Sequence, residues 1–384
     1  MNSMPFQKMQ VNPITSMTQI DAGAWNRLVK DGYPFLRHEF LLALEQSGCA
    51  SSQTGWSPQH LLVMQNHELL AFMPLYLKSH SRGEYVFDQQ WAQAYQQYGF
   101  RYYPKWLTAV PFTPCQGPRV AIDDAADAPA VMRLLTGFIK ERAGQDAISS
   151  WHCLFPDPSQ AEWLRGLGLS LRESVQFHWF NKGYRDFDDF LQTFSSGKRK
   201  MIKRERRRVS EQGIELRRLN GPEVSPAQWQ AFFQFYTMTY LKNGMPPYLN
   251  PAFFEQLAAT MGERLLLVLA AKDGEYVGAA LSVIGDTLYG RYWGCHEAYS
   301  GLHFEACYYQ GLEYCIEHGL KRFDSGAQGE HKIARGFEPV TTYSAHWLRD
   351  AAFAGAVDHF LAEEREAMAF YKQEAAAYLP FKKG

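Results

Sequence analysis

The stretch Arg264–Ile284 reads RLLLVLAAKDGEYVGAALSVI. Two apolar runs of strand length flank the dipeptide Asp273-Gly274. Asp-Gly between two such runs is among the strongest local signals for a β-hairpin, because both central residues of the tight turn need a positive φ. The stretch therefore predicts two antiparallel strands, followed by a third strand at Leu288–Gly294.

The same order of elements occurs earlier in the chain. Residues 61–77 form a second predicted hairpin, and it overlays on the first with Glu68 on Glu275. In both halves the hairpin is followed by a strand, a loop, a helix, a strand, a short helix and a strand. In the first half, Tyr85–Phe87 is the candidate for the strand directly after the hairpin. Strands and helices mixed in this way predict an α/β fold with mixed sheets, in two related domains.

These repeats set the expected domain boundaries. We expect a first domain at residues 1–185, a basic helical connector at 186–213, and a second domain at 214–384 that ends in a long amphipathic helix. Trp25–Ser47 is predicted to be one helix with Pro34 near its start.

The expected connector contains the segment GKRKMIKRERRRVSEQG, residues 197–213. The protein as a whole has a formal net charge of -1, so the positive charge is concentrated here. We expect a helix that begins near Ser195 or Ser196, with Ile202 and Val209 anchoring one side. Two basic stripes then adjoin on the other side: Arg199, Lys203 and Arg206; Lys200, Arg204, Arg207 and Arg208. Phosphates of a tRNA or of a nucleotide-linked precursor would compensate this charge, and the alternative is a solvated charge run.

Composition limits the remaining classes. The 384 residues are 46% apolar, enough for two cores, and no apolar run approaches the ~18 residues of a membrane span. The first residues lack the apolar segment of a secretory signal, and the six cysteines show no disulfide or zinc spacing. We expect a cytoplasmic protein that binds no specific DNA sequence, since no recognised DNA-binding motif is present.

Three stretches of the second half carry a family resemblance: residues 292–299 (YWGCHEAY), 304–310 (FEACYYQ) and 323–337 (FDSGAQGEHKIARGF). With the two repeats and the basic helix, they resemble the Fem-type branch of the GNAT superfamily. Residues 35–41 (FLRHEFL) and 111–119 (PFTPCQGPR) narrow the resemblance to a FemAB-like family of bacterial peptidoglycan-biosynthesis proteins. The resemblance implies tandem GNAT-like domains, no metal and no cofactor. It implies transfer of an aminoacyl group from tRNA to a small-molecule or peptide amine, forming an amide.

The loop Gly326–Lys332 is the expected catalytic site. It follows a predicted strand and precedes a short helix, which is where α/β folds place ligands. Glu330 or His331 would accept the proton of the amine, and Lys332 and Arg335 would position the acceptor. The alternative is a helix-capping loop with solvent-exposed charges.

Further substrate contacts are expected from several parts of the chain. Lys198, Arg199, Lys203 and Arg204 of the basic helix would hold donor phosphates. His296 and Glu305 belong to a cluster with His303, Cys295 and Cys307 whose spacing is not that of a zinc site. Two aromatic residues and one arginine complete the set, although burial in a core is the alternative for the rings: Trp179, Tyr248 and Arg119.

Coenzyme A is the other donor to consider. GNAT acetyltransferases hold its pyrophosphate on a Gln/Arg-x-x-Gly-x-Gly/Ala loop at a helix start. The corresponding places, Tyr299–His303 and Cys115–Arg119, do not satisfy that pattern, which argues against acetyl-CoA. A CoA-dependent N-acyltransferase and a non-catalytic protein that binds an anionic ligand remain the alternatives.

Overall fold

The computed structural model describes residues 8–30, 32–327 and 329–382, and these form two compact units. Unit 1 takes in the described residues up to Ser174 together with Thr341–Ala369. Unit 2 takes in those of Val175–Val340 and Phe370–Gly384. The amino-terminal residues 1–7 and Gln328 of the predicted catalytic loop lie outside the described residues. The division differs from the expected one, because residues 186–213 belong to unit 2 and do not form a separate connector.

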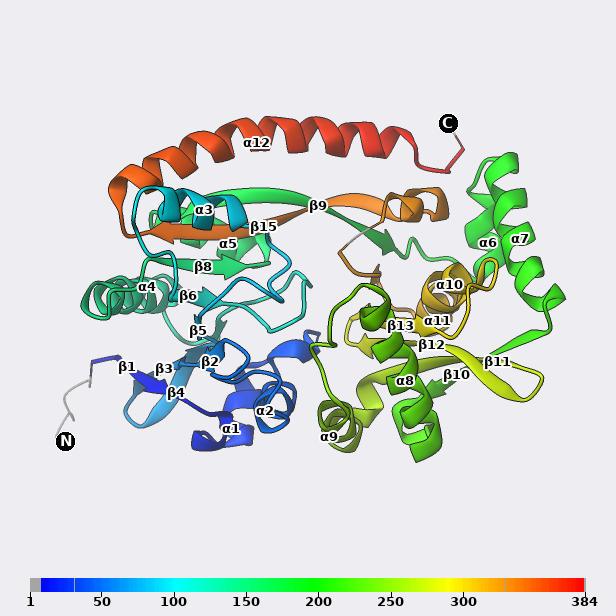
Figure 1. Ribbon diagram of the computed structural model, residues 1–384, viewed down its shortest axis with the longest axis horizontal. Helices are drawn as coiled ribbons and strands as arrows, with labels where there is room; N and C mark the ends of the chain where they lie inside the picture. The colour runs from blue at the N-terminus through cyan, green and yellow to red at the C-terminus, as the bar shows by residue number, and fades with distance from the viewer. Residues whose placement is uncertain (1–7, 31, 328, 383–384) are drawn as a thin grey trace. The chain divides into compact units, whose positions relative to one another are not determined.

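Unit 1 is built from short strands and covering helices (Figure 1). Its elements are β1 (Gln10–Ile14), α1 (Ala22–Leu28), α2 (His38–Gln46), β2 (Trp56–Pro58), β3 (His60–Gln65), β4 (Glu68–Met73), β5 (Tyr76–Lys78), α3 (Gln89–Gln97), β6 (Lys105–Thr108), β7 (Ala121–Ile122), α4 (Ala128–Gln145), β8 (Ser150–Leu154), α5 (Pro158–Gly166), the start of β9 (Ser170–Phe180), most of β15 (Glu338–Leu348) and the start of α12 (Ala351–Ala377).

Two sheets organise unit 1. One has the strand order β1-β3-β4-β7, and the predicted hairpin supplies β3 and β4. The other runs β2-β5-β6-β8-β15. The second strand of the predicted 61–77 hairpin is divided at Pro74 into β4 and β5, which belong to different sheets. Proline has no N–H to donate to a neighbouring strand, so the ladder is interrupted there.

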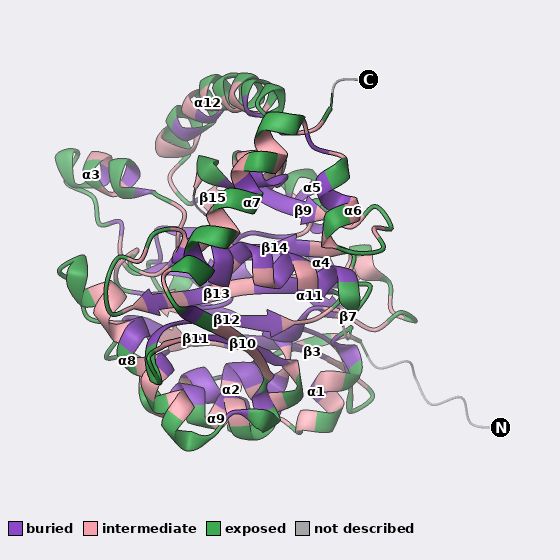
Figure 2. Ribbon diagram, turned by 90° about the vertical axis from the view of Figure 1, so that its right-hand side faces the viewer, coloured by how far each residue is buried: buried purple, intermediate pink, exposed green. Residues whose placement is uncertain are grey.

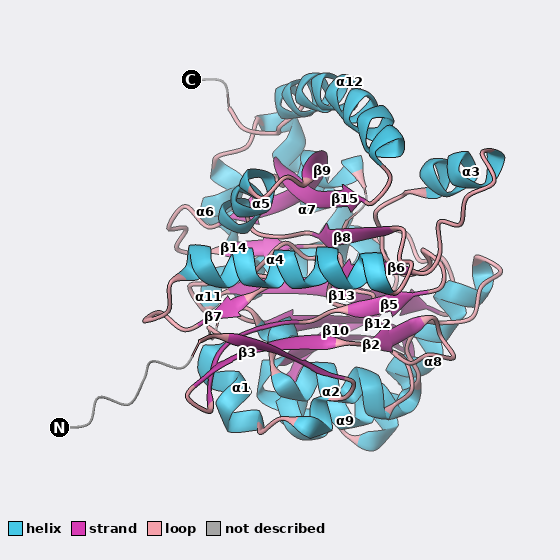
Figure 3. Cartoon of the chain, turned by 90° about the vertical axis from the view of Figure 1, so that its left-hand side faces the viewer, coloured by secondary structure: helices cyan, strands magenta, loops and turns pink. Residues whose placement is uncertain are grey.

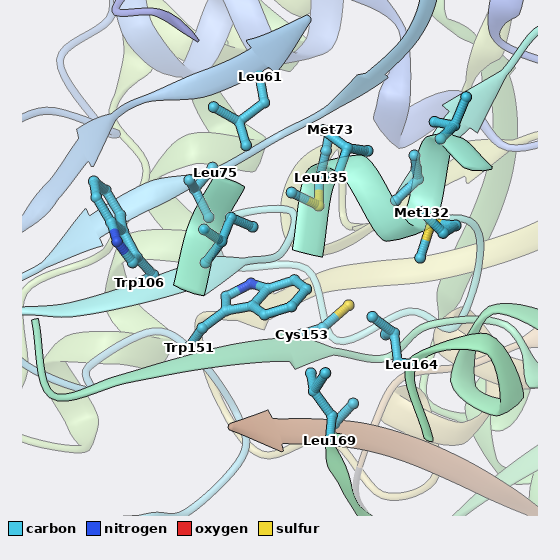
Figure 4. Close-up of a cluster of buried hydrophobic side chains, with 14 of the residues drawn as sticks. Leu61, Met73, Leu75, Trp106, Met132, Leu135, Trp151, Cys153, Leu164 and Leu169 are labelled. Atoms are coloured by element: carbon cyan, nitrogen blue, oxygen red, sulfur yellow. The ribbon is translucent and has the colours of Figure 1, made fainter. Parts of the chain in front are cut away.

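Helix α4 closes the core of unit 1 by contacting β1, β3 and β8 (Figure 3). Apolar side chains from both sheets and from α4 meet beneath it, among them Leu61, Met73, Leu135 and Trp151 (Figure 4). All four are at most 1% exposed. This burial of large apolar side chains is the main stabilising contribution in the unit.

Unit 2 contains the basic helix and the strongest hairpin. Its elements are the end of β9, α6 (Phe187–Gln192), α7 (Ser196–Glu211), β10 (Ile214–Asn220), α8 (Pro226–Lys242), α9 (Pro251–Met261), β11 (Leu265–Lys272), β12 (Glu275–Ile284), β13 (Thr287–Cys295), α10 (Leu302–Phe304), the π-helical turn η5 (Glu305–Tyr309), α11 (Gln310–Glu317), β14 (Arg322–Asp324), the 3-10 helix η6 (Glu330–Arg335), the start of β15 and the end of α12.

The sheet of unit 2 has the order β10-β11-β12-β13-β14-β9. The hairpin β11–β12 is confirmed, and its turn residues Asp273 and Gly274 have φ of 51° and 84°. Its strands are largely buried (Figure 2). Strand β13 runs parallel to β14 only over Thr287–Tyr289, and then continues to Cys295 while β14 ends at Asp324. The ladder between the two strands therefore ends at Tyr289 and Asp324.

The predicted repeat is present in the order of elements, and the repeats exchange their last strands. Strand β9 of the first repeat pairs with β14 through His178 and Asp324, inside unit 2. Strand β15 of the second repeat pairs with β8 through His346 and His152, inside unit 1. This exchange is why the unit boundaries fall at Ser174 and Thr341 instead of at the expected position 185.

Two local predictions are wrong. Tyr85–Phe87 is not a strand: Tyr85 has a φ of 60°, which an extended chain does not adopt. The predicted helix Trp25–Ser47 is divided: α1 ends at Leu28, and a 3-10 turn at Pro34–Leu36 precedes α2. No helix within the described ranges has the length and apolar character needed to cross a bilayer.

Candidate functional site

A small cavity opens beyond the end of the β13–β14 ladder. Its volume is about 90 Å3, and its walls come from β12, β13 and the helical segment after β13. The polar and aromatic wall residues are Ser282, Arg291, Tyr292, Trp293, His303, Cys307, Tyr308 and Ser325. The Ser325 hydroxyl is buried and has no hydrogen-bond partner within the described part of the chain, so a ligand in the cavity would find a free polar group.

The helical segment that follows β13 contains a π-helical turn. Three residues of α10 lead into η5, and α11 follows. The extra residue of a π turn shifts the register of the side chains, and such turns are frequent at functional sites. Here the turn supplies Cys307 and Tyr308 to the cavity wall. The sequence pattern did not reveal this turn or the role of Tyr308.

Tyr308 orients the predicted base His331. The Tyr308 hydroxyl and His331 Nε2 lie 2.8 Å apart. Gly329, with a φ of 114°, lets the imidazole lie against the backbone: a Cβ there would come within 2.3 Å of His331 Cε1. Burial, then Arg335 and Lys332, lower the pKa of His331. A neutral imidazole at pH 7 is able to accept a proton.

Lys332 is a buried amine beside this histidine. It is 1% exposed, and its Nζ donates to the carbonyl of Gly326 at 2.7 Å. Burial lowers the pKa of Lys332 to about 8, although the Asp324 carboxylate opposes the shift. Asp324 is itself buried and lies 3.6 Å from His178 Nε2 across the β14–β9 ladder. The lysine therefore loses its proton more readily than a surface lysine.

Arg335 is held inside the fold. Its guanidinium donates to both carboxylate oxygens of Glu205 at 2.8 and 2.9 Å, to the Tyr309 hydroxyl at 3.1 Å and to the His331 carbonyl at 2.6 Å. It also lies 3.5 Å from the ring centroid of Phe304. With four of its five N–H donors used in this way, Arg335 positions η6 against α7.

Glu305 is likewise engaged. It is 4% exposed and accepts from Arg206 at 2.9 and 3.0 Å and from Gln310 at 2.8 Å. Arg206 also donates to Glu313 at 2.6 Å. The two neighbouring charges Glu205 and Arg206 thus fix α7 to η6, η5 and α11, so one part of the basic segment faces the protein.

The rest of α7 faces outward. Ser195 precedes the helix, and Ile202 and Val209 are buried as predicted. Lys203 lies 2.9 Å from Asp188 in an exposed pair, and Arg207 lies 3.3 Å from Glu211. Five cations form no ion pair with any residue that the structure describes: Lys198, Arg199, Lys200, Arg204 and Arg208. These five cations form a positive strip, in which Lys200, Arg204 and Arg208 are exposed and Lys198 and Arg199 are half-buried.

Helix α7 also covers the place where a pyrophosphate loop would begin. A Cβ on Gly301 would lie 3.2 Å from the Glu205 carbonyl oxygen. The Gln212 amide donates to the Ser300 carbonyl at 2.9 Å and accepts from the Ser300 N–H at 3.1 Å. The start of the α10 segment is therefore packed against protein.

The remaining predicted residues lie apart from the cavity. His296 is exposed after β13, and the half-buried Tyr248 has its ring 5.6 Å from that of Tyr240. Trp179 is 1% exposed in the core of unit 2, packed with Tyr184 and Phe190. Glu330 is exposed and accepts from the Tyr371 hydroxyl at 2.7 Å.

Arg119 is a buried structural residue of unit 1. It is 1% exposed and donates to the carbonyls of Leu154 and Cys115 at 2.6 Å and to the Tyr33 hydroxyl at 2.9 Å. These bonds satisfy backbone carbonyl groups in and beside the Pro-rich loop 111–119, which contains no regular helix or strand that could pair them.

Sequence reasoning missed a buried polar network in unit 1. Lys105 donates to Glu84 at 2.8 Å and to Asp88, and the Tyr102 hydroxyl donates to Asp88 at 2.7 Å. The network continues from Tyr102 to His152 at 3.1 Å and to His346, whose Nδ1 lies 2.7 Å from His152 Nδ1. The only sequence signal is that the pair His346-Trp347 repeats His178-Trp179.

Burial determines the charge states of this network. It lowers the pKa of His152 to about 3, and it raises the pKa of Glu84 to about 7 although Lys105 opposes that shift.

Within the described residues, no three His, Cys, Asp or Glu side chains gather in a group suited to a metal ion.

We compared the chain with known proteins. No curated protein sequence matches the chain. Among solved structures, the carboxyl-terminal domain of a putative lysylphosphatidylglycerol synthetase from Agrobacterium fabrum is 12% identical and has a TM-score of 0.54; the match covers 91% of this chain and 97% of that one. FemX is 12% identical with a TM-score of 0.53, over 88% and 97% of the two chains. L-PGS from Bacillus licheniformis is 10% identical with a TM-score of 0.50, over 86% and 98%.

Together the family model and the fold that these solved structures share place the chain among Fem-type proteins. More closely, the chain belongs to the FemAB-like family of peptidoglycan biosynthesis/recognition, whose model matches residues 16–383. The predicted fold class and family are thereby confirmed.

Proposed function

We propose that the protein transfers an aminoacyl group from the ester of an aminoacyl-tRNA to an amine of a peptidoglycan precursor. The observation that carries the proposal is the pairing of a neutral histidine with a buried lysine beside the cavity. His331 is oriented by Tyr308, and Lys332 is buried next to it. The exposed cations of α7 support a donor that bears many phosphates.

In the proposed reaction the amine nitrogen attacks the carbonyl carbon of the ester. A C–N bond forms, the ester C–O bond breaks, and the products are an amide and the free ribose hydroxyl of the tRNA. His331 accepts the proton that the nitrogen loses and returns it to the leaving oxygen. Glu330 is the alternative proton acceptor, but it lies exposed and bonded to Tyr371. Positioning and charge stabilisation supply most of the acceleration.

Lys332 would stabilise the charge that develops during the reaction. As an ammonium it stabilises the negative oxygen of the tetrahedral intermediate, and in a site from which water is excluded such a charge acts strongly. Arg335 acts through others: it holds η6, which carries His331 and Lys332, against Glu205 of α7. Arg199 and Arg204, with Lys198 and Lys203 beside them, would bind donor phosphates.

The packing of α7 against Gly301 and Ser300 favours this donor over coenzyme A, since a pyrophosphate would need the helix start that α7 covers. The proposed reaction belongs to the cytoplasm, where charged tRNA is available.

The test is transfer of a radiolabelled amino acid from a pool of charged tRNA to a muropeptide precursor with a free amine, with the product identified by mass spectrometry. We expect amide product from the wild type, and a loss of at least about 100-fold in Lys332→Met and in His331→Ala. Lys321→Met, an exposed lysine outside the site, is the matched control. Transfer from acetyl-CoA, or transfer that survives both substitutions, would contradict the proposal.

Binding of the donor is tested separately. Arg199→Glu combined with Arg204→Glu reverses two charges of the strip, so tRNA affinity and its dependence on salt should both fall. Arg218→Glu, on β10 and already bonded to Glu317, is the control. Equal tRNA binding by the wild type and the α7 variant would remove the α7 strip as the surface that binds the donor, while acyl transfer is judged by the first assay. No tRNA binding by the wild type at low salt would remove tRNA as the donor.

A further inference from the structure

An aromatic surface on unit 1 lies outside every site described so far. It is formed by Tyr98 and Phe100, which are 74% and 52% exposed, and by the half-buried Phe353. We call these three rings the α3 platform. Figure 2 colours α3 with exposed and buried residues side by side. Exposed rings gathered in one place are unusual on a protein surface and indicate a binding site.

The platform is held rigidly. Helix α3 ends in a Schellman motif: Gly99 has a φ of 77°, and the Phe100 N–H donates to the Tyr95 carbonyl at 2.8 Å. Tyr95 is 3% exposed and stacks beneath Phe353 with ring centroids 4.0 Å apart. The rings of Tyr98 and Phe100 stand edge-on to Phe353 at 5.9 and 5.5 Å. Little conformational entropy is therefore lost when a ligand binds these rings.

Free amide groups surround the platform. The segment from Gln89 to Arg101 reads QQWAQAYQQYGFR, and Arg101 is its only charged residue. All five glutamines are exposed: Gln89, Gln90, Gln93, Gln96 and Gln97. Their amides form no hydrogen bond to the protein over the ranges that the structure covers. Each amide offers both donors and an acceptor, and none adds charge.

We infer that the α3 platform binds a neutral glycan. A sugar ring presents C–H groups on its face, which pack on an aromatic ring, and hydroxyl or acetamido groups at its edge, which pair with amides. A membrane surface fits less well, because interfacial helices carry several Lys or Arg residues and this segment has Arg101 alone. The family description, peptidoglycan biosynthesis/recognition, names a polymer that contains such a glycan. This inference does not rest on the proposed reaction.

The experiment is a calorimetric titration of the full chain with chitotetraose, a neutral oligosaccharide of N-acetylglucosamine. We expect saturable binding that Tyr98→Ala combined with Phe100→Ala weakens by at least about tenfold. Gln96→Ala combined with Gln97→Ala should also weaken it, since amides are lost while the rings remain. Tyr378→Ala, an equally exposed ring in unit 2, should leave binding unchanged. Circular dichroism checks that each variant folds.

Three results would overturn the inference. One is the absence of saturable binding up to about 10 mM chitotetraose, beyond the range of weak specific complexes. Another is binding to vesicles of phosphatidylcholine and phosphatidylglycerol that depends on the two rings and grows when the glutamines become alanine, which would assign the platform to a membrane. The last is self-association that the ring variant abolishes, which would make it an interface between two copies.

Discussion

Replacement of Lys332 by methionine should abolish transfer while changing the free energy of unfolding only slightly. Burial lowers the pKa of Lys332 from 10.5 to about 8. At 1.36 kcal/mol for each pKa unit, keeping this lysine protonated in the folded state costs about 3 kcal/mol at neutral pH. Methionine removes that cost, and it leaves the Gly326 carbonyl without its donor at a cost of about 1–3 kcal/mol. We therefore expect the free energy of unfolding at pH 7 to change by less than about 2 kcal/mol, while transfer is lost.

The pH dependence has a definite sign. Below pH 8 the lysine is protonated in both the folded and the unfolded protein, so its full destabilising cost is present. As the pH rises from 8 toward 10.5, the folded protein releases the proton first and the cost disappears. The free energy of unfolding of the wild type, measured relative to that of Lys332→Met, should therefore rise by about 2–3 kcal/mol between pH 7 and pH 10.

Urea unfolding of both proteins at the two pH values measures this difference, and groups common to both proteins cancel. Lys321→Met is the exposed control and should show no such change. If the difference between wild type and Lys332→Met moves by less than about 1 kcal/mol, burial does not depress the pKa of Lys332 and the reasoning fails. A loss of more than about 3 kcal/mol at pH 7 would mean that the amine stabilises the fold.

Other substitutions test the contacts around the site. Arg335→Met leaves Glu205 without its bidentate partner, so the melting temperature should fall by at least about 6 °C, corresponding to about 3 kcal/mol or more; a fall below about 2 °C would show that the pair is not structural. Lys105→Met removes the cation that the buried carboxylates of Glu84 and Asp88 share, and it should cost about 3–5 kcal/mol in urea unfolding. Lys332→Met, at a similarly buried lysine, should cost far less; equal costs would contradict the assigned charges. Tyr308→Phe removes the partner of His331 Nε2, so the acid limb of the pH–rate profile should move while the stability changes by about 1 kcal/mol; an unchanged profile would exclude His331 as the proton acceptor.

Elements with strong local signals were predicted from the sequence. The Asp273-Gly274 hairpin is present where it is predicted, because turn residues and runs of apolar residues act within a few positions of the chain. The basic helix begins after Ser195, as expected, although the serine hydroxyl makes no cap hydrogen bond, and its two predicted anchors Ile202 and Val209 are buried. The motifs that carry the family resemblance lie elsewhere, mainly in β13, in η5 and in the segment from β14 to η6.

The contacts that build the site join residues far apart in the chain, and only the tertiary structure decided them. Glu205 and Arg335, 130 positions apart, convert part of a basic segment into an internal support, and His152 and His346 meet across 194 positions. The exchange of β9 and β15 between the units has the same character. A charged or aromatic residue has the same local pattern whether it faces solvent or a distant partner. Burial and pairing depend on which strands the folded chain brings side by side, and the sequence by itself determined the elements but not their neighbours.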